Sequence, residues 1–279
     1  MSVRANPVRA NPVVLDLLMQ QVRGALETCA HRPVIIGVCG SQASGKSTLC
    51  SAAVAACQAD GLAAATLSID DIYLTRTERE VLAREVHPLL ITRGPPGTHD
   101  VTLGNDIIDA LRKGEGTALP RFDKPRDDRA PPARWDKAPA GCEVLFFEGW
   151  CVGANPQTAA ELADPVNSLE AEKDAAGRWR SYANACLAGD YQDLFARLDR
   201  LVLLAAPSFE VVLDWRIEQE EGLRARSDDE AAQFMNAAAI AKFIAHYERL
   251  TRHILAEMPA RADLLVRLDE QRRPLDLSM

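Results

Sequence analysis

The chain has 279 residues, enough for one large α/β domain or two small ones. Apolar residues make up 47% and charged residues 26%, and the low aromatic share of 5% predicts a core of mainly aliphatic side chains. The formal net charge of -8 disfavours a general nucleic-acid binder, because such a protein needs a positive surface to displace counterions. It does not disfavour ATP, because a phosphate site depends on local amides and a few cations.

The seven cysteines are scattered and include no C-x-x-C pair, so we expect reduced thiols rather than disulfides or a zinc site. No apolar run approaches the ~20 residues that span a bilayer. The apolar stretch 13–19 is short and contains Asp16, which does not fit a signal peptide. These features predict a cytoplasmic protein without a membrane or nucleic-acid partner.

The N-terminus repeats the sequence Arg-Ala-Asn-Pro-Val at residues 4–8 and 9–13. Two prolines in such a short polar stretch do not sustain a helix, so residues 1–12 are expected to be a disordered tail. Residues 13–279 are expected to form a single domain. Its first element is a helix that starts at Val14 and ends before Pro33, because apolar residues recur there at helical spacing.

Five apolar runs predict strands that alternate with helices. They are Val34–Cys39, Ala63–Ile69, Glu143–Phe147, Arg200–Ala205 and Leu264–Leu268. The alternation predicts an α/β fold with a doubly wound, mostly parallel sheet flanked by helices. Each run ends in polar or turn residues, where such a sheet normally places its ligand.

Two polar stretches, 92–142 and 153–182, are rich in Pro, Gly and charge, and we interpret them as insertions of this one domain. A last long helix is expected to open at residues 227–230, which have the spacing of a capping box. Its apolar face would pack on the core through Ile240, Ile244, Tyr247, Ile254 and Met258.

Residues 40–47 match the pattern G-x-x-x-x-G-K-[ST] completely. A loop of this length can point successive backbone N–H groups at a phosphate, while the lysine reaches the β- and γ-phosphates and the serine hydroxyl binds Mg²⁺. The pattern lies between a buried strand and a helix, the context that supports a P-loop NTPase fold. The predicted nucleotide-binding residues are Gly40, Ser41, Gln42, Ala43, Ser44, Gly45, Lys46, Ser47 and Thr48.

Two acidic strand ends favour a kinase over a switch or a transporter. The chain has neither Asn-Lys-x-Asp after the fourth predicted strand nor a Leu-Ser-Gly-Gly-Gln signature. It does have Asp70-Asp71 after the second strand, where a carboxylate can accept a proton from an acceptor hydroxyl, although a turn or helix cap is the alternative. Glu148, after the third strand, is a candidate Mg²⁺ ligand.

Longer blocks of sequence resemble the ATP-dependent D-glycerate 3-kinases, which are related to the uridine kinases, phosphoribulokinases and pantothenate kinases. The blocks are Asp70-Asp71-Ile72-Tyr73, Arg93–Asp100, Pro120–Lys124, Glu148–Gly153, Trp179-Arg180 and Asp214–Glu220. The resemblance covers residues 34–247, most of the chain.

The resemblance implies transfer of a phosphoryl group from ATP to the 3-hydroxyl of D-glycerate, with Mg²⁺ as cofactor. It implies that Asp70 is the catalytic base, acting with Lys46, and that Ser47, Asp70 and Glu148 gather around the metal. It suggests Asp100 as a ligand for substrate hydroxyls, with the motif residues Tyr73, His99 and Asp123 as further substrate contacts. An acidic substrate calls for a bidentate arginine, and Arg93 and Arg129 are the candidates.

Arginines on the helix predicted after the fourth strand suggest a lid. In this kinase group a comparable helix brings an arginine onto the transferring phosphoryl group, and Arg216 is the candidate, with Arg224 and Arg226 behind it. Arg216 could instead pair with Glu220 one turn later.

Two alternatives to a glycerate kinase stay open at this stage. One is a P-loop kinase for another small acceptor, such as a nucleoside, a pantothenate-like molecule or a sugar phosphate. The other is a nucleotide-binding regulatory protein without an acceptor.

Overall fold

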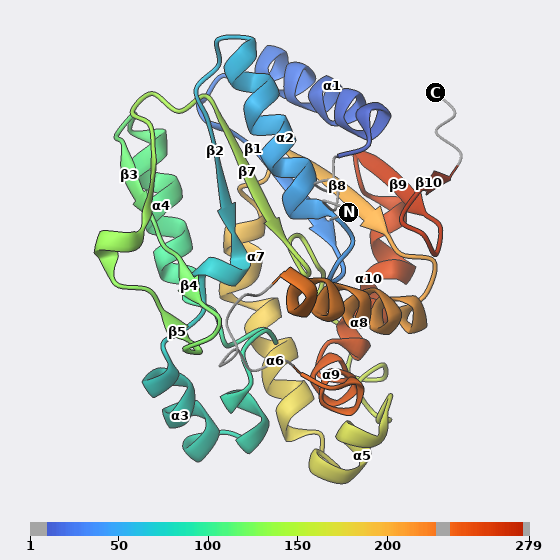
Figure 1. Cartoon of the computed structure of the whole chain (residues 1–279). Coiled ribbons are helices and arrows are strands. Elements are labelled where there is room, and N and C mark those ends of the chain that lie inside the picture. The colour runs from blue at the N-terminus through green and yellow to red at the C-terminus, as the bar shows by residue number, and fades with distance from the viewer. Residues whose placement is uncertain (1–9, 227–234, 276–279) are drawn as a thin grey trace.

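A computed structural model of the chain describes residues 10–226 and 235–275. Its centre is a six-stranded sheet in the order β10-β9-β8-β1-β7-β2 (Figure 1). All neighbouring strands are parallel except the β9–β10 pair at one edge. The six strands are β1 (Val34–Gly40), β2 (Ala64–Ser68), β7 (Val144–Gly149), β8 (Arg200–Ala205), β9 (Leu264–Leu268) and β10 (Pro274–Leu275).

Helices cover both faces of the sheet. Ten α-helices are described: α1 (Pro12–Thr28), α2 (Lys46–Ala59), α3 (Arg76–Glu85), α4 (Val101–Arg112), α5 (Ser168–Lys173), α6 (Arg178–Ala188), α7 (Asp190–Phe195), α8 (Phe209–Arg226), α9 (Ala237–Ile244) and α10 (Glu248–Glu257). The predicted doubly wound, mostly parallel α/β sheet is therefore confirmed. Within the described ranges, no helix combines the length and apolar character that a bilayer span requires.

Alternation along β1 explains the two layers of helices. Val34, Ile36 and Val38 point to one face of the sheet and join a cluster with α1, α2 and Trp215 of α8. Ile35 points to the other face and joins a cluster with α4, α7 and α10. A central strand buried on both faces needs apolar side chains on both faces, which is why this run lacks polar alternation. At Gly37 a Cβ would lie 2.7 Å from the Leu198 side chain, which would have to shift to make room for it.

The predicted strands match closely, and the predicted last helix does not. Strands β8 and β9 have the predicted bounds, and the other three shift by at most two residues at an end. The expected long helix is two helices, α9 and α10, separated at residues 245–247. Its predicted start at residues 227–230 lies outside the described residues, as does most of the predicted N-terminal tail.

The two polar stretches form secondary structure of their own. Residues 92–142 contain α4, a two-stranded ladder of β3 (Thr117–Leu119) with β6 (Asp136–Ala138), and a second ladder of β4 (Phe122–Asp123) with β5 (Asp128–Arg129). Four short 3₁₀ turns complete the chain: η1 (Ile69–Ile72), η2 (Pro88–Ile91), η3 (Pro132–Arg134) and η4 (Met258–Ala260). The β4–β5 hairpin lies beyond the carboxyl end of β2 (Figure 1).

Candidate active site

The loop between β1 and α2 has the backbone shape that a phosphate cradle requires. Gly45 has a φ of 93° and Ala43 a φ of 59°, both in the left-handed region, and α2 begins directly afterwards at Lys46. At Gly40 a Cβ would lie 2.7 Å from the Ser44 hydroxyl oxygen, so the first glycine leaves room for the turn. The N-terminus of α2 therefore faces the loop, and its free N–H groups and dipole favour an anion there.

Buried polar atoms in this loop have no partner among the described residues. They are the hydroxyls of Ser41 and Ser44 and the side-chain carbonyl of Gln42. Buried polar groups are nearly always hydrogen-bonded in folded proteins, so a group of orphans in one loop indicates a place where a polar ligand binds.

The loop contacts the acid at the end of β7. The Ser47 hydroxyl donates to Glu148 Oε1 at 2.7 Å, and Lys46 Nζ lies 3.9 Å from Glu148 Oε2. Glu148 is buried, and its Oε2 accepts no hydrogen bond from the described residues. A hydroxyl and a carboxylate are the hard oxygen ligands that Mg²⁺ prefers, so these residues fit the metal that the sequence predicts.

Asp70 lies at the end of β2, in the 3₁₀ turn η1. The Ser68 hydroxyl accepts from the Asp70 N–H and caps this turn, which turns the chain sharply after the strand. The Asp70 carboxylate accepts from the Tyr73 hydroxyl at 2.6 Å and from Lys124 Nζ at 2.9 Å. Burial alone would raise the pKa of the Asp70 carboxyl. Lys124, Lys46 and the Tyr73 hydroxyl together lower this pKa below its usual value.

The neighbouring carboxylate, Asp71, has a different role. Asp71 accepts from Arg121 Nη1 at 2.6 Å and from the Phe122 backbone N–H at 3.0 Å. Burial raises its pKa, and these two donors only partly offset the effect. Asp71 therefore anchors the start of the β4–β5 hairpin, while Asp70 remains in the cleft beside it.

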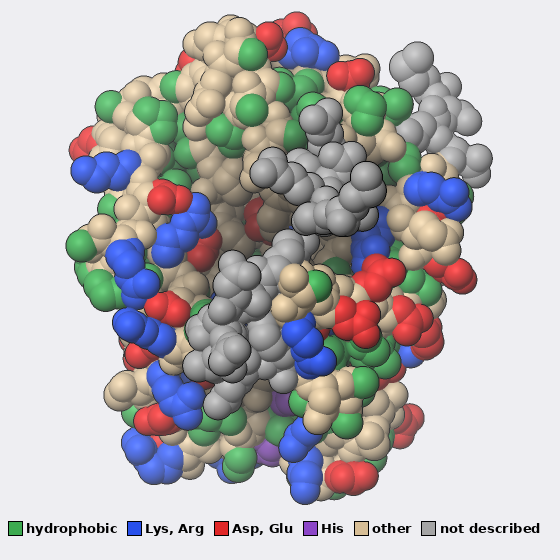
Figure 2. Space-filling view, in the orientation of Figure 1, with side chains coloured by type: hydrophobic (Ala, Val, Ile, Leu, Met, Phe, Trp, Pro, Cys, Tyr) green, Lys and Arg blue, Asp and Glu red, His purple; other side chains and the backbone are tan. Residues whose placement is uncertain are grey.

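These groups share one cleft of about 430 Å³. Its lining combines Lys46 and Ser47 with the strand-end acids Asp70 and Glu148. Figure 2 shows the surface hollowed near its middle, between the part of the molecule that holds α2 and the part that holds α8 and α9. The predicted base, phosphate-binding lysine and metal ligands are therefore all brought together.

A second space of about 410 Å³ adjoins this cleft and shares Lys46, Ser47 and Gln219 with it. Arg272 closes one side: its Nε donates to the Ala43 carbonyl at 2.9 Å, and its Nη1 lies 2.6 Å from Glu218 of α8. Arg272 thus ties the phosphate loop to α8. Arg272 carries no sequence signal for this role, since it comes 229 positions after its partner in the loop.

The candidate lid residue Arg216 lines the cleft and also makes the alternative contact considered above. Its Nη2 pairs with Glu220 at 2.7 Å, and its buried Nη1 has no hydrogen-bond partner among the described residues. Nη2 is thus held by a residue of α8, and Nη1 is available to a ligand in the cleft. Arg224 is on the same helix, and the side chain of Arg226 lies outside the description.

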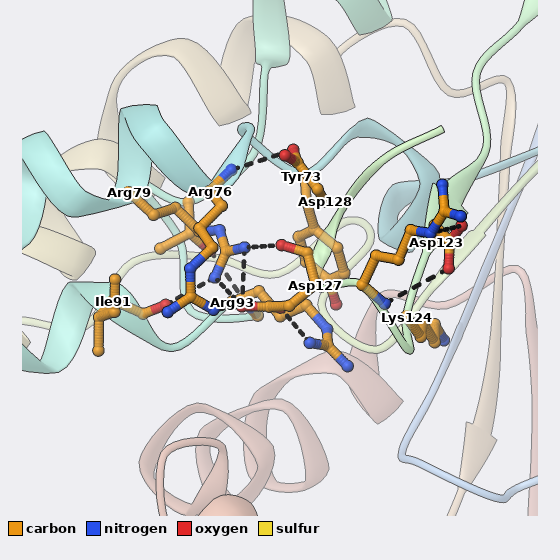
Figure 3. A network of polar contacts seen from close by, with 12 residues as sticks. Tyr73, Arg76, Arg79, Ile91, Arg93, Asp123, Lys124, Asp127 and Asp128 are labelled. Atoms are coloured by element: carbon orange, nitrogen blue, oxygen red, sulfur yellow. Dashed lines mark hydrogen bonds and ion pairs between the residues drawn. The ribbon is translucent and has the colours of Figure 1, made fainter. Parts of the chain in front are cut away.

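Two of the predicted substrate residues, Tyr73 and Arg93, line the cleft. Arg93 pairs with Asp127 and packs 5.4 Å above the Phe122 ring. Figure 3 shows Asp127 between the guanidinium groups of Arg93, Arg76 and the fully buried Arg79. Asp127 has a φ of 54°, so its backbone bends the hairpin tip back toward these arginines.

The other four predicted substrate residues lie outside the lining of this cleft. His99 is buried against Tyr73, its Nδ1 lies 2.6 Å from the Tyr191 hydroxyl, and burial lowers its pKa to about 3. Asp100 caps α4 through the Leu103 N–H and pairs with Arg129 at 3.0 Å.

Arg129 also donates to the Tyr73 carbonyl, and Asp123 pairs with Arg126 and Arg134. In this structure His99, Asp100 and Arg129 support Tyr73 from behind. Direct substrate contact by His99, Asp100, Asp123 and Arg129 stays a prediction.

Lys124, Tyr247 and Trp150 are among the residues of the lining that were not predicted as site residues. Lys124 belongs to the Pro120–Lys124 block and to a basic stretch of the sequence, residues 121–137. Tyr247 was expected to be core packing, but its hydroxyl donates to the Arg93 carbonyl at 2.9 Å. Trp150 donates to the Gly94 carbonyl at 3.1 Å and packs edge-on against Tyr247.

The chain matches a known protein family that fits this geometry. The phosphoribulokinase/uridine kinase family matches residues 35–174. The chain belongs to this family. It is therefore a member of a family of phosphotransferases, as its phosphate loop and strand-end acids indicated.

Several relatives of this kinase resemble it over most of its length. A protein of Schizosaccharomyces pombe described as the uncharacterized kinase mug58 is 36% identical over 224 residues, 74% of this chain and 78% of that protein. The chloroplastic D-glycerate 3-kinase of Arabidopsis thaliana is 31% identical over 270 residues, 87% of this chain and 54% of that protein. The predicted resemblance to D-glycerate 3-kinases is confirmed by this match.

Solved structures show the same fold. A D-glycerate 3-kinase from Cryptococcus neoformans var. grubii has a TM-score of 0.76 at 22% identity, covering 95% of this kinase and 98% of that chain. The YGR205w protein has a TM-score of 0.72 at 23% identity, covering 94% of each chain. At these identities the likeness concerns the fold alone.

A group of possible metal ligands lies away from this cleft. Cys29, His31 and Asp199 place their ligand atoms within 4.8 Å of one another, near the start of β8. The guanidinium of Arg112 lies 3.5 Å from the imidazole Nε2 of His31, and Arg32 donates to the carbonyls of Cys29 and His31. This positive surrounding disfavours a bound cation, and all seven cysteines are free thiols, as predicted.

Proposed function

We propose that this protein is a D-glycerate 3-kinase, which transfers the γ-phosphoryl group of Mg-ATP to the 3-hydroxyl of D-glycerate. One observation carries the proposal: Asp70 lies in the same cleft as Lys46 and Ser47, beside basic side chains suited to an acidic acceptor. The similarity to proteins named D-glycerate 3-kinase supports this acceptor.

The phosphate loop has the groups to bind and orient the nucleotide. Its backbone N–H groups and the N-terminus of α2 would hold the β- and γ-phosphates, with the Lys46 ammonium beside them. Ser47 and Glu148 would hold Mg²⁺, with Asp70 as the further predicted ligand, and the ion when bound would neutralise phosphate charge. The adjoining space beside Arg272 and α8 is the place for the rest of the nucleotide.

Asp70 would take the proton in the transfer step. The 3-hydroxyl oxygen of the acceptor forms a bond to the γ-phosphorus, and the bond from that phosphorus to the β–γ bridging oxygen breaks, leaving ADP. The hydroxyl proton passes to the Asp70 carboxylate. The free edge of the Arg216 guanidinium would face the charge on the transferring group.

The test is an acceptor panel with Mg-ATP, measured by acceptor-dependent release of ADP. D-glycerate is expected to be turned over with the highest kcat/KM, above uridine, pantothenate and sugar phosphates. Turnover of another acceptor in preference to D-glycerate would assign a different kinase activity to the same cleft. ATP binding without turnover of any acceptor would favour a regulatory protein.

A further inference from the structure

The β4–β5 hairpin projects one lysine into the cleft from a rigidly held frame. Its start is anchored by Asp71 through Arg121 and the Phe122 N–H, and its far side by the contacts of Asp127 with Arg79 and Arg93. Figure 3 shows the contacts of Asp127 with Arg79 and Arg93 on the segment that carries Lys124. The backbone position of Lys124 is therefore fixed by neighbours that do not themselves need to move.

The arginines of the cleft lining already hold structural carboxylates. Arg93 pairs with Asp127, Arg121 with Asp71, and Arg216 with Glu220. Each of these carboxylates belongs to a loop or helix that the pair stabilises. A substrate that recruited one of these arginines would have to compete with a contact that builds the site.

Lys124 differs from these arginines in its partner and its exposure. Its ammonium contacts Asp70, the proposed base, and its side chain is 56% exposed. The ammonium is carried by a flexible, half-exposed side chain, so it can exchange Asp70 for another carboxylate that replaces the lost ion pair.

The contact also has the right spacing for a short hydroxy acid. A cation within 2.9 Å of Asp70 stands beside the point where the acceptor hydroxyl must meet the base. In a three-carbon acid the carboxylate lies roughly 4–5 Å from the terminal hydroxyl, as C–C bonds of about 1.5 Å dictate. A lysine side chain with rotatable bonds can cover that distance by changing rotamer.

We propose that Lys124 moves from Asp70 to the carboxylate of the acceptor and so makes the kinase select an anionic acceptor over a neutral polyol. This inference rests on the proposed function and names the residue responsible for its acceptor specificity. The move also removes the Lys124 hydrogen bond from the Asp70 carboxylate, which leaves that oxygen free to accept the proton of the acceptor hydroxyl. Arg93 remains on Asp127 throughout.

The test compares the wild type with Lys124→Met, using D-glycerate and glycerol, the neutral polyol that lacks the carboxylate. We expect Lys124→Met to raise KM for D-glycerate about 10- to 100-fold, the loss expected for one charge-assisted hydrogen bond. Turnover of glycerol and KM for ATP should change less than about 3-fold, because neither involves the carboxylate. Lys124→Arg should recover part of the D-glycerate affinity.

The matched control is Arg126→Gln. Arg126 is a cation of the same hairpin, is 73% exposed and pairs with Asp123 outside the cleft lining. It should leave KM for both acceptors within about 2-fold. Thermal unfolding of the variants checks that they fold, which the exposure of both side chains predicts.

Two results would overturn the inference. An equal loss of D-glycerate and glycerol turnover in Lys124→Met would mean that Lys124 only positions Asp70. An unchanged KM for D-glycerate would mean that another group holds the carboxylate. Failure of the proposed function looks different: the wild type itself would not turn over D-glycerate, and the role of Lys124 would fall with it.

Discussion

Replacing Asp70 by asparagine tests the chemical step at a single atom. The amide keeps the size of the carboxylate and retains an oxygen that accepts from the Tyr73 hydroxyl. It cannot accept the proton of the acceptor hydroxyl, and it no longer attracts Lys124. We expect kcat to fall by at least about 10²-fold, the usual contribution of a general base, which corresponds to about 2.7 kcal/mol of activation free energy.

The affinity for ATP should change little in this variant. The phosphate loop, Lys46 and Ser47 make no hydrogen bond to Asp70 in the structure, so the dissociation constant of a fluorescent ATP analogue should stay within about 5-fold. Steady-state release of ADP at saturating D-glycerate measures kcat. Near-normal turnover by Asp70→Asn would remove this residue from the chemical step.

The adjacent Asp71→Asn is the matched comparison. Asp71 anchors the hairpin through Arg121 and the Phe122 N–H, so its loss should act mainly on the placement of the acceptor. We expect KM for D-glycerate to rise by about 3- to 10-fold with a smaller change in kcat. A loss of kcat equal to that of Asp70→Asn would mean that the two carboxylates act as one unit.

The pH dependence has a defined sign. The neighbouring cations lower the pKa of Asp70, so its basic form persists below the ordinary aspartate value of about 3.9. Protonation of Asp70 should therefore cause no loss of kcat/KM between pH 8 and pH 5. An acid limb with a midpoint in this range that disappears in Asp70→Asn would contradict this assignment.

Three further substitutions, the last with a matched control, test separate parts of the molecule. Lys46→Ala should weaken ATP binding by at least about 10²-fold in calorimetry, because it removes the cation beside the phosphate loop; unchanged binding would place the nucleotide elsewhere. Arg216→Met should lower kcat by about 10²- to 10³-fold with little effect on either KM; an effect on stability alone would leave it as the partner of its own helix. Gly94→Ala should lower the free energy of unfolding by about 2–4 kcal/mol, because its φ is +121° and a Cβ would lie 2.0 Å from the Tyr247 hydroxyl. Gly114→Ala, at a φ of +78° with open space, should cost only about 1 kcal/mol in the same denaturant titration; equal losses would show that the contact with Tyr247 is not what matters.

The sheet was predictable because its signal is local. A parallel strand buried on both faces gives a short apolar run whatever its neighbours are, and strands β8 and β9 have the bounds that these runs predict. Strand β10 has two residues and β4 and β5 have two each, too few to show any periodicity. These elements form only because the chain beside them is already folded.

The break between α9 and α10 has no sequence signal, since neither proline nor glycine occurs at residues 245–247. The structure gives the reason: the break places Tyr247 with its hydroxyl on the Arg93 carbonyl, 154 positions earlier in the chain. A tertiary contact of this kind overrides the helical pattern.

The site also has a part that was predictable from the sequence and a part that was not. The phosphate loop and Asp70 were predictable because each is a short pattern at a strand end, where the fold itself brings such ends together. The contact between Lys124 and Asp70 spans 54 positions and depends on how the hairpin is held by Asp71 and Asp127. Spacing along the sequence contains no information on that arrangement.

Phosphorus NMR of the reaction product tests the proposed activity most directly. The enzyme is incubated with Mg-ATP and D-glycerate, and the coupling of the new phosphorus signal to carbon-bound protons is recorded. Phosphorylation of the terminal hydroxyl gives coupling to a methylene group, as we predict for an acceptor whose 3-hydroxyl meets Asp70. Coupling to the single proton of the central carbon, or no new phosphorus signal at all, would contradict the proposed reaction.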